Sequence, residues 1–360
     1  MWLQRLDIRN VRNLLDVKLN PSSRLNIIEG LNGSGKTSLL ESIYLLSCGK
    51  SFRTHRFANL LTQGCDWMGV YAKLSEKHNR IISIGLEHRN GKNLIKADGN
   101  RLQKASELAN YLPIVVIHQE SHRVFTQSPK YRRAFVDWGV FHVEQKFLAS
   151  WQYFSRTLKQ RNTVLSQRKS TVSVDHWDLA LHKSALLIDS FRQEYLNQLI
   201  PLFNYYAAAL VSVDDEITIE YKRGWSDKED YLSVLKASIG RDRSLGYTQK
   251  GPHRADITFK LCGVPLHEYI SRGQQKLLVC SLYIAQASLF TKLTGLTPLF
   301  VIDDITAELD NPHIDRLMAL LNGLESQIFV TTPDKLSVDS SLFPDVKMFH
   351  VEHGKIAEVV

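Results

Sequence analysis

Residues Gly30 to Thr37 place glycines, a lysine and a threonine at the spacing G-x-x-x-x-G-K-T. The glycines permit tight turns in which backbone N–H groups converge on an anion. A largely apolar run, residues 25–28, precedes the motif and predicts a buried strand, and apolar residues at 39, 40, 43 and 46 follow it at helical spacing. A strand, a glycine-rich loop and a helix in this order are typical of a P-loop that binds a nucleoside triphosphate. The alternative, an ordinary glycine turn before a helix, does not explain the complete motif.

Each residue type in the loop has a predicted role. Lys36 is expected to reach the β- and γ-phosphates and to act in catalysis, and Thr37 is expected to bind Mg²⁺. The N-terminus of the following helix adds positive potential. The expected cofactors are ATP and Mg²⁺. The residues expected to bind the nucleotide are Gly30, Leu31, Asn32, Gly33, Ser34, Gly35, Lys36 and Thr37.

A second apolar run, residues 298–302, ends in Asp303 and Asp304, which is a Walker B pattern. In open α/β sheets, ligands bind at the carboxyl ends of the strands, where these carboxylates would lie. We expect Asp303 to hold Mg²⁺, through water, and Asp304 to orient or deprotonate an attacking water. An isolated aspartate pair is more often a turn or a helix cap, but the P-loop favours the catalytic interpretation.

The string Ser-Arg-Gly-Gln-Gln-Lys at 271–276 precedes a strongly apolar, helical run over 277–290. A serine in this position can simply cap a helix. The string also resembles the signature motif of ABC-type ATPases, which contacts the γ-phosphate bound to a second subunit. That resemblance implies that Ser271 and Gly273 bind nucleotide across a subunit interface and that Ser271 takes part in catalysis there.

Two further strings follow the Walker B pattern. Ala-Glu-Leu-Asp at 307–310 resembles a D-loop, which implies a catalytic role for Asp310 across the same interface. Thr331 and Thr332 end a predicted strand where such ATPases usually carry a histidine that senses the γ-phosphate. A threonine can donate a hydrogen bond there but cannot act as a charged acid or base. The Q-loop residue is either Gln119 or Glu120.

Composition restricts the class of protein. The 360 residues contain 44% hydrophobic and 23% charged residues, which is ordinary for a soluble globular protein. A net charge of +8 favours a polyanionic partner such as nucleic acid. Four widely separated cysteines with no C-x-x-C pair argue against a zinc site or a disulfide framework and fit a reducing cytoplasm. We expect no signal peptide and no membrane-spanning helix, because no apolar run reaches about 18 residues.

The chain divides into three segments by pattern. Residues 1–117 predict mixed α/β structure with antiparallel strands, and Asn-Gly and Asp-Gly pairs at 90–91 and 98–99 predict hairpin turns. Residues 118–244 predict a helical insertion with a helical hairpin, and residues 245–360 return to α/β structure. The predicted fold is α/β, a P-loop ATPase head of the ABC/SMC type, in which a mixed sheet and an antiparallel lobe are interrupted by the helical insertion.

The whole chain resembles the RecF family, bacterial recombination-mediator ATPases of the SMC-like branch. The resemblance rests on the P-loop, the Walker B and signature strings, and on GKSFR at 49–53, PKYRRAFVDWG at 129–139, KQRN at 159–162 and GPHRAD at 251–256. Ala255 is a departure, since the family more often carries aspartate there. The resemblance implies slow, DNA-stimulated ATP hydrolysis and an ATP-dependent homodimer. It further implies a role at gapped DNA or single-strand/double-strand junctions with RecO and RecR, recombinase loading, replication restart and a link to the SOS response.

Basic residues of the middle segment are the candidate DNA contacts, which we expect to be sequence-independent and salt-sensitive. They are Lys130, Arg132, Arg133, Lys159, Arg161, Arg168 and Lys169. Three alternative functions were weighed. The ATPase subunit of an ABC transporter would need a membrane partner. A small-molecule kinase or a GTPase would lack the signature string. A DNA clamp with negligible hydrolysis would keep nucleotide binding alone.

Overall fold

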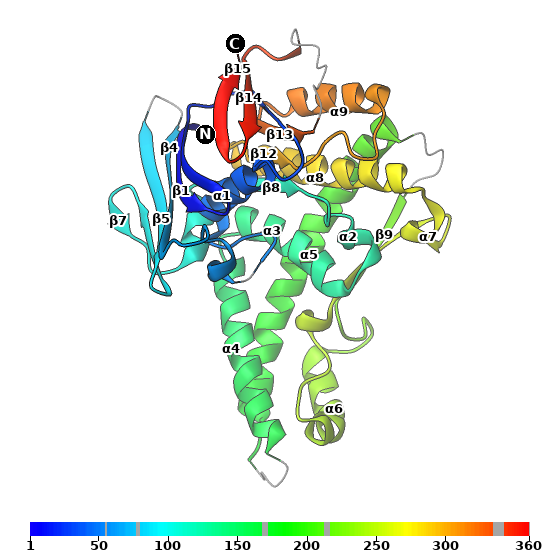
Figure 1. The fold of residues 1–360 in the computed structure, drawn as a ribbon. Coiled ribbons are helices and arrows are strands. Elements are labelled where there is room, and N and C mark those ends of the chain that lie inside the picture. Colours follow the sequence, from blue (N-terminus) through cyan, green and yellow to red (C-terminus); the bar gives the residue numbers. More distant parts are fainter. Residues whose placement is uncertain (55, 77–79, 168–171, 212–216, 334–341, 360) are drawn as a thin grey trace. The chain divides into compact units, whose positions relative to one another are not determined.

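The computed structural model spans residues 1–360 and describes all of them except 55, 77–79, 168–171, 212–216, 334–341 and 360. The chain forms two compact units (Figure 1). The first contains Met1–Ser121, Ala209–Val211 and Arg272–Val360, and the second contains His122–Ala208 and Ser212–Ser271. The second unit therefore extends beyond the boundary expected at residue 245, because residues 256–261 pair with a strand at 217–222 instead of joining the head.

A mixed sheet in the first unit carries the nucleotide motifs. Its strand order is β15-β14-β3-β13-β12-β8, and all neighbours are parallel except β14 and β15. The strands β3, β8, β12 and β13 are buried at every residue, as expected for parallel strands with both faces of the sheet covered. Their bounds are β3 Leu25–Glu29, β8 Ile114–Ile117, β12 Leu299–Ile302, β13 Ile328–Thr332, β14 Val346–Glu352 and β15 Lys355–Val359. The carboxyl ends of β3, β12 and β13 meet at one edge of the sheet.

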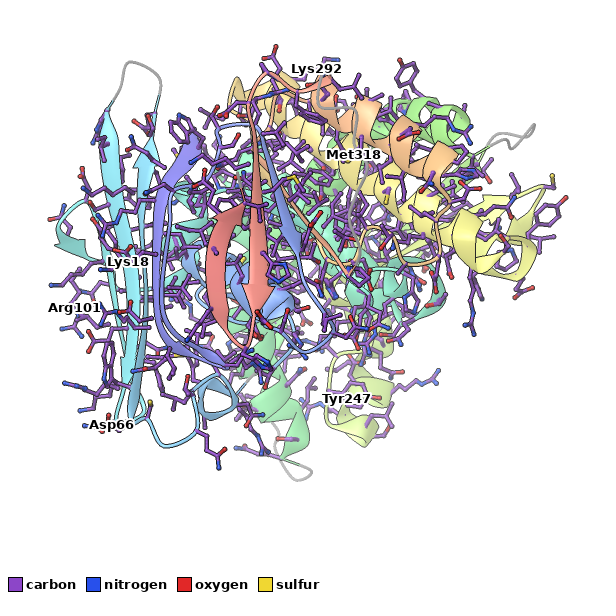
Figure 2. The ribbon with its side chains drawn as sticks, turned by 45° about the horizontal axis from the view of Figure 1, so that its top comes forward. Lys18, Asp66, Arg101, Tyr247, Lys292 and Met318 are labelled. Atoms are coloured by element: carbon purple, nitrogen blue, oxygen red, sulfur yellow. The ribbon has the colours of Figure 1, made fainter. Side chains whose placement is uncertain are left out.

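The second sheet of this unit is antiparallel, with the order β2-β1-β4-β5-β6-β7. Asn90-Gly91 and Asp98-Gly99 both adopt positive φ angles, which confirms the predicted hairpin turns. Charged side chains line both edge strands, for example Lys18 on β2 and Arg101 on β7 (Figure 2), and such charges oppose pairing with another chain. The bounds are β1 Trp2–Val11, β2 Leu14–Leu19, β4 Trp67–Ser75, β5 Ile81–Arg89, β6 Lys92–Ala97 and β7 Asn100–Arg101.

Helix α1 (Lys36–Cys48) joins the two sheets of this unit through one hydrophobic core, to which it contributes Leu40 and Ile43. The unit also contains α8 (Arg272–Thr294) and α9 (Asn311–Gly323), which pack against each other. Lys292 marks the end of α8 in Figure 2, and Met318 lies on α9. The observed mixed and antiparallel sheets confirm the predicted head fold.

Among the described residues, α8 alone is long and apolar enough to cross a membrane by length and composition. Its most apolar window has a mean hydropathy of 1.4, and 67% of that window is buried inside the structure. The core helix of an α/β domain meets the same criteria.

The second unit is mainly helical and contains the predicted helical hairpin, formed by α4 (Phe147–Ser166) and α5 (Asp175–Leu210). Its other helices are α2 (Arg123–Thr126), α3 (Pro129–Val143), α6 (Tyr231–Leu245) and α7 (Leu266–Tyr269). A small antiparallel sheet, which the sequence analysis missed, consists of β9 (Ile217–Lys222), β10 (Asp256–Leu261) and β11 (Val264–Pro265).

A buried ionic cluster ties the helical hairpin to the rest of the second unit. Arg161 of α4 is fully buried. Its guanidinium donates to Asp178 of α5 at 2.6 Å, to Asp242 of α6 at 2.8 Å and to the Thr248 hydroxyl at 2.7 Å. Burial raises the pKa of Asp178, and the Arg161 charge opposes that rise. Arg161 therefore serves the packing of this unit, and its prediction as a DNA contact is wrong.

Two other predicted DNA contacts are also engaged inside this unit. Arg132 forms a bidentate ion pair with Asp256, at 2.7 and 3.1 Å, and Arg133 donates to the carbonyl oxygen of Ala255 at 2.6 Å. The two segments 129–139 and 251–256, on which the family resemblance partly rests, are thus in direct contact. Ala255, where an aspartate was expected, contributes a backbone carbonyl as acceptor. Lys130 and Lys159 are exposed and remain candidates. Arg168 and Lys169 lie outside the described residues.

Candidate nucleotide-binding site

The P-loop connects the carboxyl end of β3 to the first turn of α1. Gly30, Gly33 and Gly35 all have positive φ angles, of 152°, 82° and 127°, which residues with a side chain rarely adopt. A Cβ atom on Gly30 would also lie 2.3 Å from the carbonyl oxygen of Val351, so the loop can follow this path only with glycine there.

Two hairpin turns, between β1 and β2 and between β14 and β15, donate hydrogen bonds to the P-loop. The side-chain amide of Asn13, after β1, donates to the Ser34 carbonyl oxygen at 2.8 Å. The backbone N–H of Gly354, between β14 and β15, donates to the same oxygen at 2.9 Å. Neither residue could be predicted from the motif, because neither lies near it in the chain. The Ser34 hydroxyl is buried and has no hydrogen-bond partner among the residues that the structure describes, and a phosphate oxygen would satisfy it.

The Lys36 side chain is 7% exposed and bends back over the loop. Its ammonium group donates to the carbonyl oxygens of Gly30 and, at 3.0 Å, of Leu31. Leu31, Asn32 and Gly33 form the exposed tip of the loop. The eight predicted nucleotide-binding residues from Gly30 to Thr37 therefore lie in one loop and the first turn of α1, and Lys36 and the first amides of that helix remain its expected phosphate donors.

The Walker A and Walker B residues meet directly. The Thr37 hydroxyl lies 3.0 and 3.1 Å from the two carboxylate oxygens of Asp303, which follows β12. Burial raises the pKa of Asp303, and the hydrogen bonds from Thr331 and Thr37 offset only part of that rise. A hydroxyl and a carboxylate at this separation are donors that Mg²⁺ accepts together with phosphate oxygens and water. Among the described residues, no group of three or more His, Cys, Asp or Glu side chains could hold a metal alone.

Thr331 is one of the two threonines at the end of β13, where such ATPases usually carry a histidine, and it supports both aspartates. Its hydroxyl donates to Asp303 at 2.8 Å and accepts the backbone N–H of Asp304 at 2.8 Å. The hydroxyl of the next residue, Thr332, lies 3.4 Å from that of Thr306. A fully buried threonine at 331 therefore fixes the Walker B turn.

Replacing Thr331 with valine should lower the free energy of unfolding by about 1–3 kcal/mol, because the partly buried N–H of Asp304 loses its acceptor and the Asp303 carboxylate loses a donor. Chemical denaturation of the two proteins measures this difference. Thr332→Val, on the same strand, is the matched control and should cost less. Equal losses from both variants would show that the Thr331 bridge has no special role.

Three of the remaining predicted residues lie at helix starts. Ser271 is exposed and immediately precedes α8, and Gly273 lies in the first turn of that helix. Asp310 is exposed and caps α9, because its carboxylate accepts the His313 N–H at 3.0 Å. The hydrogen bonds from the His313 side chain and backbone lower the pKa of Asp310.

Asp304 is half-buried, and its carboxylate accepts a hydrogen bond from the Thr306 hydroxyl at 3.4 Å. Gln119 and Glu120 are both exposed after β8, so the structure does not distinguish them as the Q-loop residue.

Comparison with known proteins identifies the family of this chain. Residues 2–356 match the family model "RecF/RecN/SMC N terminal domain". The chain is 41% identical to the DNA replication and repair protein RecF of Pseudomonas aeruginosa strain UCBPP-PA14, over 99% of this chain and 98% of the relative. It is 37% identical to the same-named protein of Aliivibrio salmonicida, over 99% of this chain and all of the relative.

Solved structures show the same fold. The recombination mediator protein RecF-ATP in the RecFOR pathway superimposes with a TM-score of 0.89 at 25% identity, covering all of this chain and 98% of that one. An SMC head bound to the C-winged helix domain of ScpA superimposes with a TM-score of 0.62 at 15% identity, over 100% and 98% of the two chains. The chain therefore belongs to the RecF family of DNA replication and repair proteins, within the wider RecF/RecN/SMC group.

Proposed function

We propose that the chain is an ATP-dependent DNA-binding protein of recombinational repair, which dimerises around two bound nucleotides and hydrolyses ATP slowly. The observation that carries the proposal is the direct contact between the Thr37 hydroxyl and the Asp303 carboxylate. Beside it lies a P-loop in which the buried Ser34 hydroxyl has no acceptor among the described residues. The full-length likeness to a RecF structure named for its ATP complex supports the identity of the nucleotide.

The residues of one subunit would bind and orient the triphosphate. The P-loop amides and Lys36 would hold the β- and γ-phosphates, and Lys36 would exchange its present carbonyl acceptors for phosphate oxygens. Thr37 and Asp303 would hold Mg²⁺, which supplies charge neutralisation at the phosphates. Asp304, held by the Thr331 bridge at its backbone, would orient or deprotonate the attacking water.

A second subunit would complete the site. Ser271 and Asp310 are exposed at the starts of α8 and α9, as residues that act across an interface must be. Their hydroxyl, carboxylate and backbone N–H groups would approach the γ-phosphate bound to the partner. Hydrolysis would remove that phosphate, weaken the interface and release DNA, so that ATP acts as a switch.

DNA and protein partners follow from the family. We infer sequence-independent binding to gapped or junction DNA, with the exposed Lys130 and Lys159 among the phosphate contacts. The RecFOR pathway named for the solved relative supports RecO and RecR as partners. We further infer recombinase loading and a cytoplasmic role linked to the SOS response, as the resemblance to the RecF family implies. The net charge of +8 is consistent with such a polyanionic partner.

Sedimentation of the wild type and of Ser271→Arg tests the dimer. We expect the wild type to dimerise with ATP but not with ADP or without nucleotide, and gapped DNA to favour the dimer. Ser271→Arg should bind ATP with unchanged affinity and stay monomeric, because a bulky cation replaces the hydroxyl at the interface. Ser190→Arg, at an exposed serine of α5, is the control and should dimerise normally. A Ser271→Arg protein that dimerises as well as the wild type would refute the trans-acting role of this residue.

A further inference from the structure

Lys276, in the second turn of α8, holds the segment that follows the Walker B strand. Its ammonium group donates to the carbonyl oxygens of Asp304 at 2.7 Å and Ala307 at 2.5 Å, and lies 3.5 Å from that of Ile305. An ammonium group has three donors and no acceptor, so these carbonyls match its hydrogen-bonding capacity. Burial lowers the pKa of Lys276, an effect that Cys280, Asp304 and Glu308 oppose.

The backbone that Lys276 holds is strained at both ends. Asp304 and Glu308 have positive φ angles of 55° and 67°, although neither is glycine. Such angles cost of order 1 kcal/mol or more each and persist where surrounding contacts impose them. Lys276 supplies contacts of this kind, because it binds three carbonyls within the strained turn. The turn contains Asp304, the carboxylate expected to act on water.

The start of α8 also packs against this turn. A Cβ atom on Gly273 would lie 3.2 Å from the carbonyl oxygen of Glu308, so the first turn of the helix and the segment before Asp310 are in close contact. Gly273 and Lys276 are three residues apart and therefore lie on the same side of the helix. A shift of the helix start would be transmitted to the 304–308 turn through both residues.

We propose that Lys276 is a positioning residue that couples the start of α8 to Asp304, and so links the two nucleotide sites of a dimer. The proposal rests on the trans-acting role of Ser271 argued above. Ser271 immediately precedes α8 and would contact the nucleotide of the partner, whereas Asp304 serves the nucleotide of its own subunit. Lys276 joins them within one chain, so that the occupancy of one site adjusts the carboxylate of the other.

Lys276→Met tests this coupling in the full-length protein, because methionine keeps the length and apolar stem of the side chain but removes its donors. We expect the dissociation constant for ATP to change by less than about threefold, since the P-loop is untouched, and kcat to fall by about tenfold or more. The Hill coefficient for ATP hydrolysis should fall toward one. Lys276→Arg, which keeps a cation and its donors, should recover part of both. Lys292→Met, at an exposed position of the same helix, should match the wild type.

Hydrogen exchange gives a readout that does not need turnover. In the ATP-bound dimer, the amides of residues 304–308 should exchange at least about tenfold faster in Lys276→Met than in the wild type. A variant that dimerises with ATP and retains wild-type kcat, Hill coefficient and exchange would overturn the coupling and leave the proposed dimer standing. A wild type that never dimerises with ATP would instead refute the proposed function, and the coupling with it. A uniform loss of thermal stability and ATP affinity, unrelieved by Lys276→Arg, would assign the residue a purely structural role.

Discussion

Lys36→Met is expected to weaken ATP binding by about 100-fold to 1,000-fold. The lysine ammonium is the only side-chain cation in the loop from Gly30 to Thr37, and it is almost fully buried. Charge-assisted hydrogen bonds to phosphate oxygens contribute about 1.5–3 kcal/mol each, so two of them contribute at least about 3 kcal/mol, or about 100-fold, because each factor of ten costs about 1.4 kcal/mol. The two carbonyl contacts that Lys36 gives up on binding ATP offset part of any larger gain, which limits the expected loss to about 1,000-fold. Titration with a fluorescent ATP analogue measures the loss.

The folded protein should tolerate this substitution. The ammonium group currently binds the Gly30 and Leu31 carbonyl oxygens, which lie near the exposed loop tip and can be hydrated when it is removed. Lys50→Met, at an exposed lysine just past the C-terminal end of α1, is the matched control and should bind ATP normally. A Lys36→Met protein that retains wild-type affinity would mean that this loop does not bind the triphosphate.

Arg161→Met should destabilise the second unit by about 3–5 kcal/mol. The substitution leaves the buried carboxylates of Asp178 and Asp242 facing each other without their shared cation, and breaking a buried ion pair from one side has costs of this size. The free energy of unfolding from urea titration, followed by near-UV circular dichroism, measures the effect.

A matched variant separates this structural role from DNA binding. Lys159→Met changes an exposed cation two residues earlier on α4 and should alter stability by less than about 0.5 kcal/mol. If Arg161→Met instead lowered DNA affinity while leaving the unfolding free energy within 1 kcal/mol of the wild type, the buried cluster would not be the main role of Arg161.

The P-loop and the hairpin turns could be predicted from the sequence, because each is formed by residues that are consecutive in the chain. The strand, loop and helix around Gly30–Thr37 follow from composition within a short window, and the predicted hairpins at 90–91 and 98–99 need only two residues each. The Asp303 carboxylate was also recognisable, since an acidic residue after an apolar run needs no knowledge of its neighbours.

The parts that failed depend on contacts between distant residues. Arg161 can be buried because Asp178 and Asp242, which lie on other helices, neutralise its charge. Without knowledge of these partners, a charged residue is expected to face the solvent, so the sequence predicted an exposed cation. Likewise, Asn13 and Gly354 support Ser34 from opposite ends of the chain. The sheet of β9 and β10 was missed because α6 separates its strands in sequence, and this pairing is what extends the second unit to residue 271.

The position of β3 in the mixed sheet has a consequence for biosynthesis. This strand leads directly into the P-loop, yet its neighbours on both sides, β13 and β14, are made about 300 residues later. A growing chain on the ribosome therefore holds an incomplete head, whereas residues 122–271 form a nearly continuous unit that can fold earlier. Because pairing of such distant segments is slow, we expect the nucleotide site to form only after residues 328–352 have been made, and a protein truncated before residue 346 to lack ATP binding.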